Sequence, residues 1–221
     1  MPRATAVIFD MDGLLVDSEC VYQRAWQTTA ASLGYPMSDE WYHSLTGTTL
    51  TSAELAVREH YGGEFPLDAF REQWVARFFA SVRAGELVAK PGALALLDAL
   101  AARAVPIALG TSSDESFVTP TLDGAGIGTA FDARVTAEMV EHGKPAPDIF
   151  LEAARRLDTA PARCIVLEDS QAGATAGLAA GMQVIVVPDL QQPVPDTRAA
   201  LAGVHASLGD ATPQVLELLD L

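Results

Sequence analysis

Two carboxylates stand two residues apart at the end of an apolar run. Asp10 and Asp12 follow residues 4–9, whose apolar composition predicts a buried strand. Residues i and i+2 of a strand share one face, so both side chains enter one small volume if the strand continues to Asp12. If the strand loosens there, Asp12 can also turn a backbone carbonyl inward. Either way the negative charge needs an offset, and a divalent cation is the usual one.

The chemistry open to this pair is phosphoryl transfer. A metal beside one carboxylate, with a second carboxylate nearby, supplies a nucleophile, a Lewis acid and a proton shuttle. The Asp-x-Asp-Gly pattern of residues 10–13 also occurs in surface turns and calcium loops. The choice between these readings therefore depends on what stands at the ends of the other strands.

Polar residues follow three more predicted strands. In chain order they are the hydroxyls Thr111, Ser112 and Ser113, the lysine Lys144, and the acids Glu168 and Asp169. The hydroxyls or the acids could cap the helices that follow them, and a loop lysine is ordinarily solvated. We expect the hydroxyls both to cap a helix that starts near Asp114 and to bind phosphate. Lys144 lies between Gly143 and Pro145, which predicts a rigid loop that aims its side chain.

The elements that must position these residues alternate between strands and helices. Strands are predicted at residues 105–109, 133–135, 164–167 and 182–187, and helices near residues 91–100, 147–157 and 172–180. The strands are continuous apolar runs, as a sheet covered on both faces requires. This order predicts an α/β fold with a doubly wound parallel sheet, in which ligands bind outside the carboxyl ends of the strands.

Residues 17–88 show a different pattern. Helical runs occur at about 21–33, 52–61 and 67–82, and no convincing strand interrupts them. We therefore predict an all-helical cap domain at 17–88, inserted into an α/β core formed by 1–16 and 89–221. Hinge motion of the cap would admit substrate and then exclude bulk water, and segments 18–22 and 45–50 would set specificity.

Composition narrows the classes of function. The 221 residues are 49% hydrophobic, which excludes a disordered chain, and no apolar run approaches the ~18 residues of a membrane span. The net charge of −15 argues against a nucleic-acid partner but not against a small phosphorylated metabolite. Two distant cysteines, Cys20 and Cys164, and an N-terminus without room for a signal peptide predict a cytoplasmic protein with reduced thiols. We expect a monomer.

Four motifs together resemble the haloacid dehalogenase superfamily of phosphotransferases. They are Phe9-Asp10-Met11-Asp12-Gly13, Thr111-Ser112, Gly143-Lys144-Pro145-Ala146-Pro147-Asp148-Ile149-Phe150 and Leu167-Glu168-Asp169-Ser170-Gln171-Ala172-Gly173. They occur in the family's order, and the resemblance covers essentially the whole chain. The insertion after the first motif resembles the helical cap of the branch that contains β-phosphoglucomutase and many sugar-phosphate phosphatases. The resemblance implies a Rossmann-like core with this cap.

The resemblance also implies a role for each matched residue. Asp10 would attack phosphorus and form an aspartyl-phosphate, and Asp12 would protonate the leaving oxygen and then activate water. Thr111, the backbone N–H of Ser112 and Lys144 would hold the phosphoryl group. Mg²⁺ would be bound by the Asp10 carboxylate, the Asp12 backbone carbonyl and Asp169, with Glu168 adjoining.

The acceptor of the phosphoryl group would be either water or a second sugar hydroxyl. A β-phosphoglucomutase is expected to carry a histidine, an arginine and an asparagine where this chain has Tyr22, Leu50 (after Gly47-Thr48-Thr49) and Glu115. We therefore predict a Mg²⁺-dependent phosphatase that hydrolyses a small phosphomonoester, such as a sugar phosphate. The alternative is a β-phosphoglucomutase-like mutase, because arginines remain in the predicted cap: Arg24, Arg58, Arg71 and Arg77.

Two other functions fit the residues less well. True dehalogenases of the superfamily lack the second aspartate and need no metal, so Asp12 and the Glu168–Asp169 pair argue against dehalogenation. A binding or regulatory protein that merely keeps the fold would lack the nucleophile or the lysine, and this chain retains both Asp10 and Lys144.

Overall fold

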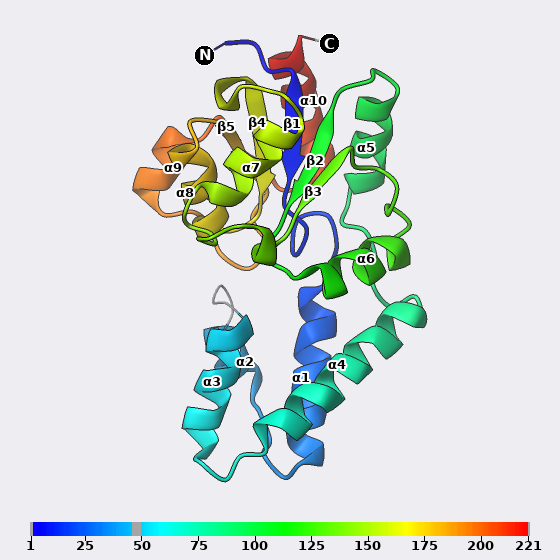
Figure 1. The fold of residues 1–221 in the computed structure, drawn as a ribbon, viewed down its shortest axis with the longest axis vertical. Coiled ribbons are helices and arrows are strands. Elements are labelled where there is room, and N and C mark those ends of the chain that lie inside the picture. The colour runs from blue at the N-terminus through cyan, green and yellow to red at the C-terminus, as the bar shows by residue number, and fades with distance from the viewer. Residues whose placement is uncertain (1, 46–49, 221) are drawn as a thin grey trace. The chain divides into compact units, whose positions relative to one another are not determined.

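The computed structural model describes residues 2–45 and 50–220 (Figure 1). By its internal contacts the chain divides into two compact units. One, which we call the α/β unit, comprises Met1–Asp17 and Val88–Leu221, and the other, the helical unit, comprises Ser18–Leu87. The segment Gly47-Thr48-Thr49, which the sequence comparison with mutases uses, lies outside the described residues.

The α/β unit is built on a six-stranded sheet in the order β3-β2-β1-β4-β5-β6, and all its pairs are parallel (Figure 1). The strands are β1 (Ala6–Phe9), β2 (Ile107–Gly110), β3 (Ala133–Val135), β4 (Cys164–Glu168), β5 (Gln183–Val186) and β6 (Gly203–Val204). Strands β2 and β3 lie on one side of β1, and strands β4, β5 and β6 lie on its other side. The switch point, where ligands bind in such folds, therefore lies between β1 and β4. The predicted doubly wound parallel sheet is confirmed.

Helices cover both faces of this sheet. They are α5 (Ala93–Ala101), α6 (Glu115–Gly124), α7 (Asp148–Arg156), α8 (Gln171–Ala179), α9 (Pro195–Ala200) and α10 (Leu208–Leu219), with 3₁₀ turns η1 (Ala137–Met139) and η2 (Pro161–Arg163). Buried residues of α7 and α8 share one core cluster with Ile8, Val166 and Val184 of the strands. Helix α10 lies behind the sheet in Figure 1, on the face opposite α7, and contacts α5.

The helical unit consists of α1 (Glu19–Ser32), α2 (Asp39–Leu45), α3 (Leu50–Tyr61) and α4 (Leu67–Arg83), and its described residues include no strand. Helices α1 and α4 pack through aromatic rings, with Trp26 centred 5.3 Å from Phe70 and 5.6 Å from Trp74. The buried carboxylate of Glu54 accepts hydrogen bonds from Arg71 and from Trp74 Nε1 (3.2 Å), which offsets its desolvation.

The first turn of α6 differs from the expectation. The helix begins at Glu115 after Asp114, and Thr111 Oγ1 accepts a hydrogen bond from the backbone N–H of Ser113 (3.1 Å). The Thr111 hydroxyl thus closes a local turn before the helix, as short polar side chains readily do, and the N-cap residue of α6 is Asp114, so the prediction that the three hydroxyls cap it was wrong. None of the helices within residues 2–45 and 50–220 combines the length and the apolar character needed to cross a membrane.

Candidate active site

The loop after β1 brings its acids to the end of β4. Asp10 follows β1 directly, and its backbone N–H donates to the carbonyl of Leu167 (3.0 Å). Gly13 then turns the chain with a φ of +80°, a left-handed conformation that favours glycine. A Cβ at this position would lie 2.4 Å from Asp169 Oδ2, so the loop can approach Asp169 this closely only without a side chain there.

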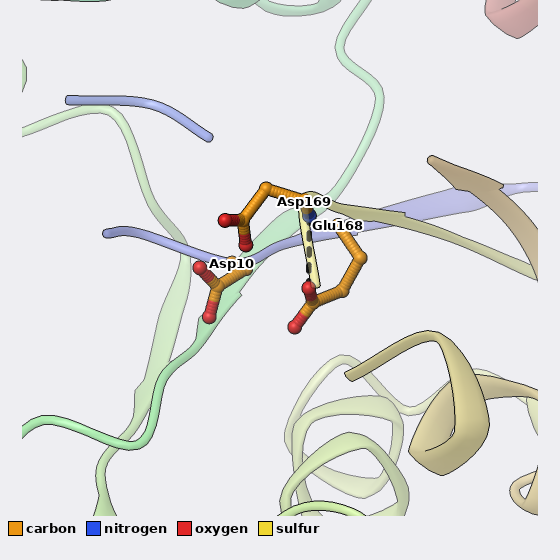
Figure 2. Close-up of side chains that lie close together, drawn as sticks. All are labelled: Asp10, Glu168 and Asp169. Atoms are coloured by element: carbon orange, nitrogen blue, oxygen red, sulfur yellow. Dashed lines mark hydrogen bonds between the residues drawn. The ribbon is translucent and has the colours of Figure 1, made fainter. Parts of the chain in front are cut away.

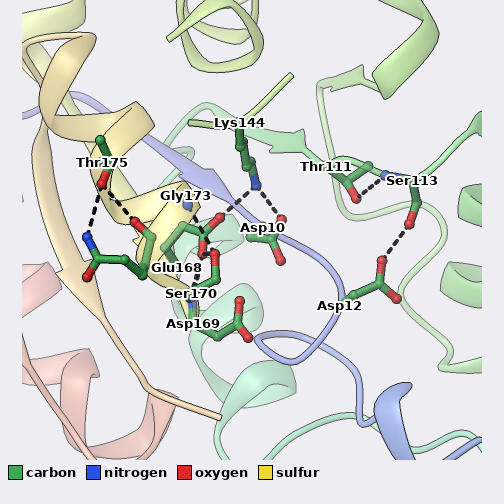
Figure 3. A network of polar contacts seen from close by, with 11 residues as sticks. Asp10, Asp12, Thr111, Ser113, Lys144, Glu168, Asp169, Ser170, Gly173 and Thr175 are labelled. Carbon is green, nitrogen blue, oxygen red and sulfur yellow. Dashed lines mark hydrogen bonds and ion pairs between the residues drawn. The ribbon is translucent and has the colours of Figure 1, made fainter. Parts of the chain in front are cut away.

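Lys144 joins two buried carboxylates. Its Nζ donates to Asp10 Oδ1 (2.5 Å) and to Glu168 Oε1 (2.7 Å), as Figure 3 shows. The exposed fractions of the three side chains are 5% for Lys144, 9% for Asp10 and 1% for Glu168. At such burial one ammonium group between two carboxylates provides the charge compensation that buried ions require.

Hydrogen bonds also hold the second carboxylate oxygen of Glu168. Glu168 Oε2 accepts from the backbone N–H groups of Asp169 and Ser170 (2.8 Å each) and from the Ser170 hydroxyl (2.9 Å). Ser170 Oγ in turn accepts from the N–H of Gly173 (3.0 Å) and caps α8. A Cβ on Gly173 would lie 1.6 Å from Glu168 Oε1, so α8 can begin against this carboxylate only because residue 173 is glycine.

Three carboxyl groups of this site fit a divalent cation. Asp10, Glu168 and Asp169 each offer one oxygen, and these oxygens lie within 4.8 Å of one another (Figure 2). Carboxylate oxygens are the ligands that Mg²⁺ and Ca²⁺ prefer. Because both oxygens of Glu168 already accept hydrogen bonds, Asp10 and Asp169 are the better placed of the three to bind a metal directly.

Asp12 has a different partner from Asp10. Asp12 Oδ2 accepts a hydrogen bond from the hydroxyl of Ser113 (2.7 Å), which follows β2. In Figure 3, Asp12 and Ser113 lie on the side of Thr111, and Asp10 faces Lys144. Thr111 is buried and Ser112 is exposed. The two aspartates are thus held by different strand ends, which gives them the separate surroundings that separate chemical roles require.

The pKa values of the buried groups follow from this arrangement. Burial, with Glu168 and Asp10 nearby, raises the pKa of Asp169 well above its usual value. Burial also raises the pKa of Asp10, although Lys144 opposes the shift. Burial disfavours the charged form of Lys144, but Asp10 and Glu168 outweigh it and raise the lysine's pKa. A bound divalent cation would offset the charge of Asp169, whose pKa burial and the neighbouring acids raise.

The structure brings together Asp10, Lys144, Glu168 and Asp169, as the sequence predicts, and it adds two contacts that the sequence does not predict. The sequence marks Ser113 only as one of the hydroxyls of its loop. Its hydrogen bond to Asp12 spans 101 residues, so no local pattern reveals it. A second ion pair at the edge of the site, Lys90 with Asp189, was not predicted at all. For Gly173, the available signal was a glycine near the start of an otherwise alanine-rich helix, which often marks a close approach.

Comparisons with known proteins agree with this fold. Residues 4–181 match the family described as haloacid dehalogenase-like hydrolase. Hexitol phosphatase A of Escherichia coli is 35% identical over 185 residues, which cover 84% of this chain and 83% of the relative. The chain matches 49% of the length of another relative, the bifunctional riboflavin kinase/FMN phosphatase of Arabidopsis thaliana, at 32% identity over 85% of this chain.

Solved structures show the same architecture. CbbY from Rhodobacter sphaeroides, in complex with phosphate, superposes with a TM-score of 0.82 at 27% identity, covering 99% of this chain and 100% of that one. β-Phosphoglucomutase from Clostridium difficile superposes with a TM-score of 0.79, covering 98% and 97% of the two chains, and at 23% identity it shows the shared fold alone.

The chain belongs to the haloacid dehalogenase-like hydrolases. The predicted resemblance to this superfamily is therefore confirmed, and so is the prediction that the chain is a phosphoric monoester hydrolase. The chain is thus a hydrolase and a phosphatase.

Proposed function

We propose that this protein is a Mg²⁺-dependent phosphatase that hydrolyses a small phosphomonoester, such as a sugar phosphate, through an aspartyl-phosphate on Asp10. The observation that carries the proposal is the buried Lys144 ammonium group in contact with Asp10 and Glu168, beside Asp169, whose pKa burial and these two acids raise. Phosphoryl transfer needs a nucleophile next to positive charge, and these residues supply both at one end of the sheet.

Asp10 is the proposed nucleophile. One of its oxygens accepts from Lys144, which leaves the other to attack phosphorus. The bond from phosphorus to the leaving oxygen breaks as the bond to Asp10 forms, and Lys144 stabilises the charge on the phosphoryl oxygens. Thr111 and the backbone N–H of Ser112 would hold the same oxygens.

Asp12 is the proposed proton shuttle. It would give its proton to the leaving alcohol oxygen and then take a proton from the water that hydrolyses the aspartyl-phosphate. Ser113 donates to one Asp12 oxygen and so orients the carboxyl group for this proton transfer. These two roles of Asp12 suit hydrolysis, in which one carboxyl group serves first as acid and then as base.

Asp10, Asp169 and the backbone carbonyl of Asp12 would hold the Mg²⁺ ion, with Glu168 adjoining. When bound, the cation would offset the charge of the acids and polarise the phosphoryl group. Glu168 would act mainly by orienting Lys144, because both of its oxygens already accept hydrogen bonds.

Water is the acceptor that we favour. The relative hexitol phosphatase A is a phosphatase by name, and it matches 84% of this chain. Tyr22, where a mutase is expected to carry a histidine, stacks on Phe78 with ring centroids 4.3 Å apart and so packs within the helical unit. Residues 17–88 would serve as the cap, and we expect the enzyme to be a cytoplasmic monomer.

Release of inorganic phosphate tests the proposal. The purified protein would be assayed against a panel of sugar phosphates and other phosphomonoesters, with Mg²⁺ and with excess EDTA. We expect release with Mg²⁺ only, and loss of at least about 10³-fold in Asp10→Asn, which removes the nucleophile. Asp98→Asn, an exposed change on α5 with the same loss of charge, is the matched control and should keep wild-type activity.

Two results would overturn it. One is an absence of release from every substrate by the wild-type protein. The other is an Asp10→Asn variant as active as Asp98→Asn. Conversion of β-glucose 1-phosphate to the 6-phosphate with a bisphosphate activator, in place of hydrolysis, would instead establish the mutase.

A further inference from the structure

A second lysine–carboxylate pair lies at the edge of the proposed metal site. Lys90 Nζ donates to Asp189 Oδ1 at 2.5 Å, and the two side chains are only 21% and 15% exposed. Lys90 lies just before α5, and Asp189 follows β5 by three residues. The two residues are 99 positions apart in sequence, and they meet because both segments reach the end of the sheet at which Asp10 and Asp169 stand.

The other oxygen of Asp189 lies next to Gly13. A Cβ built on Gly13 would lie 3.2 Å from Asp189 Oδ2 and 2.4 Å from Asp169 Oδ2. Both oxygens therefore flank the same point on the loop that follows the proposed nucleophile. Oδ1 of Asp189 is engaged by Lys90, so the two ends of this carboxylate face different partners.

The segments that carry the pair are held by backbone hydrogen bonds. The N–H of Lys90 donates to the carbonyl of Leu15 (2.9 Å), and the N–H of Asp17 donates to the carbonyl of Val88 (3.0 Å). On the other side, the N–H of Val187 donates to the carbonyl of Glu168 (2.8 Å). The position of Asp189 is thus tied to the same strand end that presents Asp169.

We propose that Asp189 is a positioning residue of the metal site: Lys90 holds one of its oxygens, and the other accepts a hydrogen bond from a water molecule on the bound cation. Lys90 also offsets the charge of Asp189, so this oxygen is supplied without adding net charge to a site that already contains Asp10, Glu168 and Asp169. Groups that orient the ligands of a metal in this way typically change its affinity by 10–100-fold when they are removed. The inference rests on the proposed function, because it assumes that the acids bind a cation.

Metal affinity, measured without substrate, tests this role. Mn²⁺ would be titrated into the metal-free protein, with free Mn²⁺ read by electron paramagnetic resonance. In Asp189→Asn the amide oxygen turns to the Lys90 donor and the NH₂ group replaces Oδ2, so the acceptor is lost while the side-chain shape is kept. We expect the Kd for Mn²⁺ to rise about tenfold. Thermal melts of the metal-free variant establish that it is folded.

Two further variants separate this role from simpler effects. Asp196→Asn, an exposed change on α9, removes the same charge and should leave the Kd within about twofold of wild type. Lys90→Met with Asp189→Ala removes both charges and the acceptor, and should bind Mn²⁺ as weakly as Asp189→Asn.

The outcomes are decisive. An Asp189→Asn Kd within twofold of wild type overturns the inference. So does wild-type affinity in the double variant, because the loss in Asp189→Asn would then come from the unpaired Lys90 charge. A wild-type protein that binds no Mn²⁺ overturns both this inference and the proposed metal dependence. Normal Mn²⁺ binding without phosphatase activity overturns the proposed function alone.

Discussion

Replacement of Gly173 by alanine tests whether the start of α8 sets the position of Glu168. The added methyl carbon would lie 1.6 Å from Glu168 Oε1 and 1.9 Å from its Cδ. Ordinary van der Waals contact between such atoms needs roughly 3.5 Å, so the carboxylate or the helix must shift by about 2 Å. A shift of that size is enough to break the 2.7 Å hydrogen bond between Lys144 Nζ and Glu168 Oε1.

The expected cost follows from three contributions. Overpacking of a filled site costs about 1–3 kcal/mol, and the loss of a hydrogen bond to a charged group costs about 1.5–3 kcal/mol. Alanine in place of glycine inside a helix returns about 1 kcal/mol. We therefore expect the free energy of unfolding of Gly173→Ala to fall by about 3 kcal/mol. Activity should fall about 10²-fold, because Lys144 and Asp10 lose their alignment.

Urea unfolding followed by circular dichroism measures the stability, and phosphate release measures the activity. Gly63→Ala is the matched control, because a Cβ at residue 63 meets no atom within 4 Å, and it should change neither quantity appreciably. A Gly173→Ala variant that is as stable as wild type would refute the reasoning. Full activity in that variant would show that Glu168 does not need its observed position.

Two other predictions concern the charges. Because burial, Glu168 and Asp10 raise the pKa of Asp169, the folded metal-free protein holds a proton that the unfolded chain releases. Its stability should therefore fall as the pH rises from about 4 through the raised pKa. Thermal melts of Asp169→Asn should show a smaller fall, because Asp10, whose pKa burial also raises, still contributes; equal slopes would contradict this. In the helical unit, Arg71→Met leaves the buried Glu54 without its cation. Because Arg71 is half exposed, we expect the free energy of unfolding, measured with urea, to fall by about 1–3 kcal/mol. An unchanged urea midpoint would contradict this expectation.

The sequence predicted the strands well where burial alone defines them. Residues 164–167 were placed within a residue of β4, because a continuous apolar run between turn residues leaves few alternatives; residues 133–135 also match β3, although that strand contains Arg134 and is only partly buried. Helix α10, β6 and the short α2 were not predicted. Strand β6 has only two residues and so presents no pattern, whereas α10 buries Leu208, Ala211, Val215 and Leu219 at helical spacing, a signal that Pro213 obscures. Tertiary contacts stabilise such elements, and a local pattern does not reveal them.

For this protein, the sequence by itself determined the α/β order, the helical insertion and the four polar strand ends, because each depends on local composition and spacing. Only the tertiary structure decided the partners. It pairs Asp10 with Lys144, Asp12 with Ser113 and Asp189 with Lys90 through hydrogen bonds, across separations of 134, 101 and 99 residues. Parallel strands bring distant segments to one edge of the sheet, and the contacts made there depend on side-chain packing that sequence spacing does not encode.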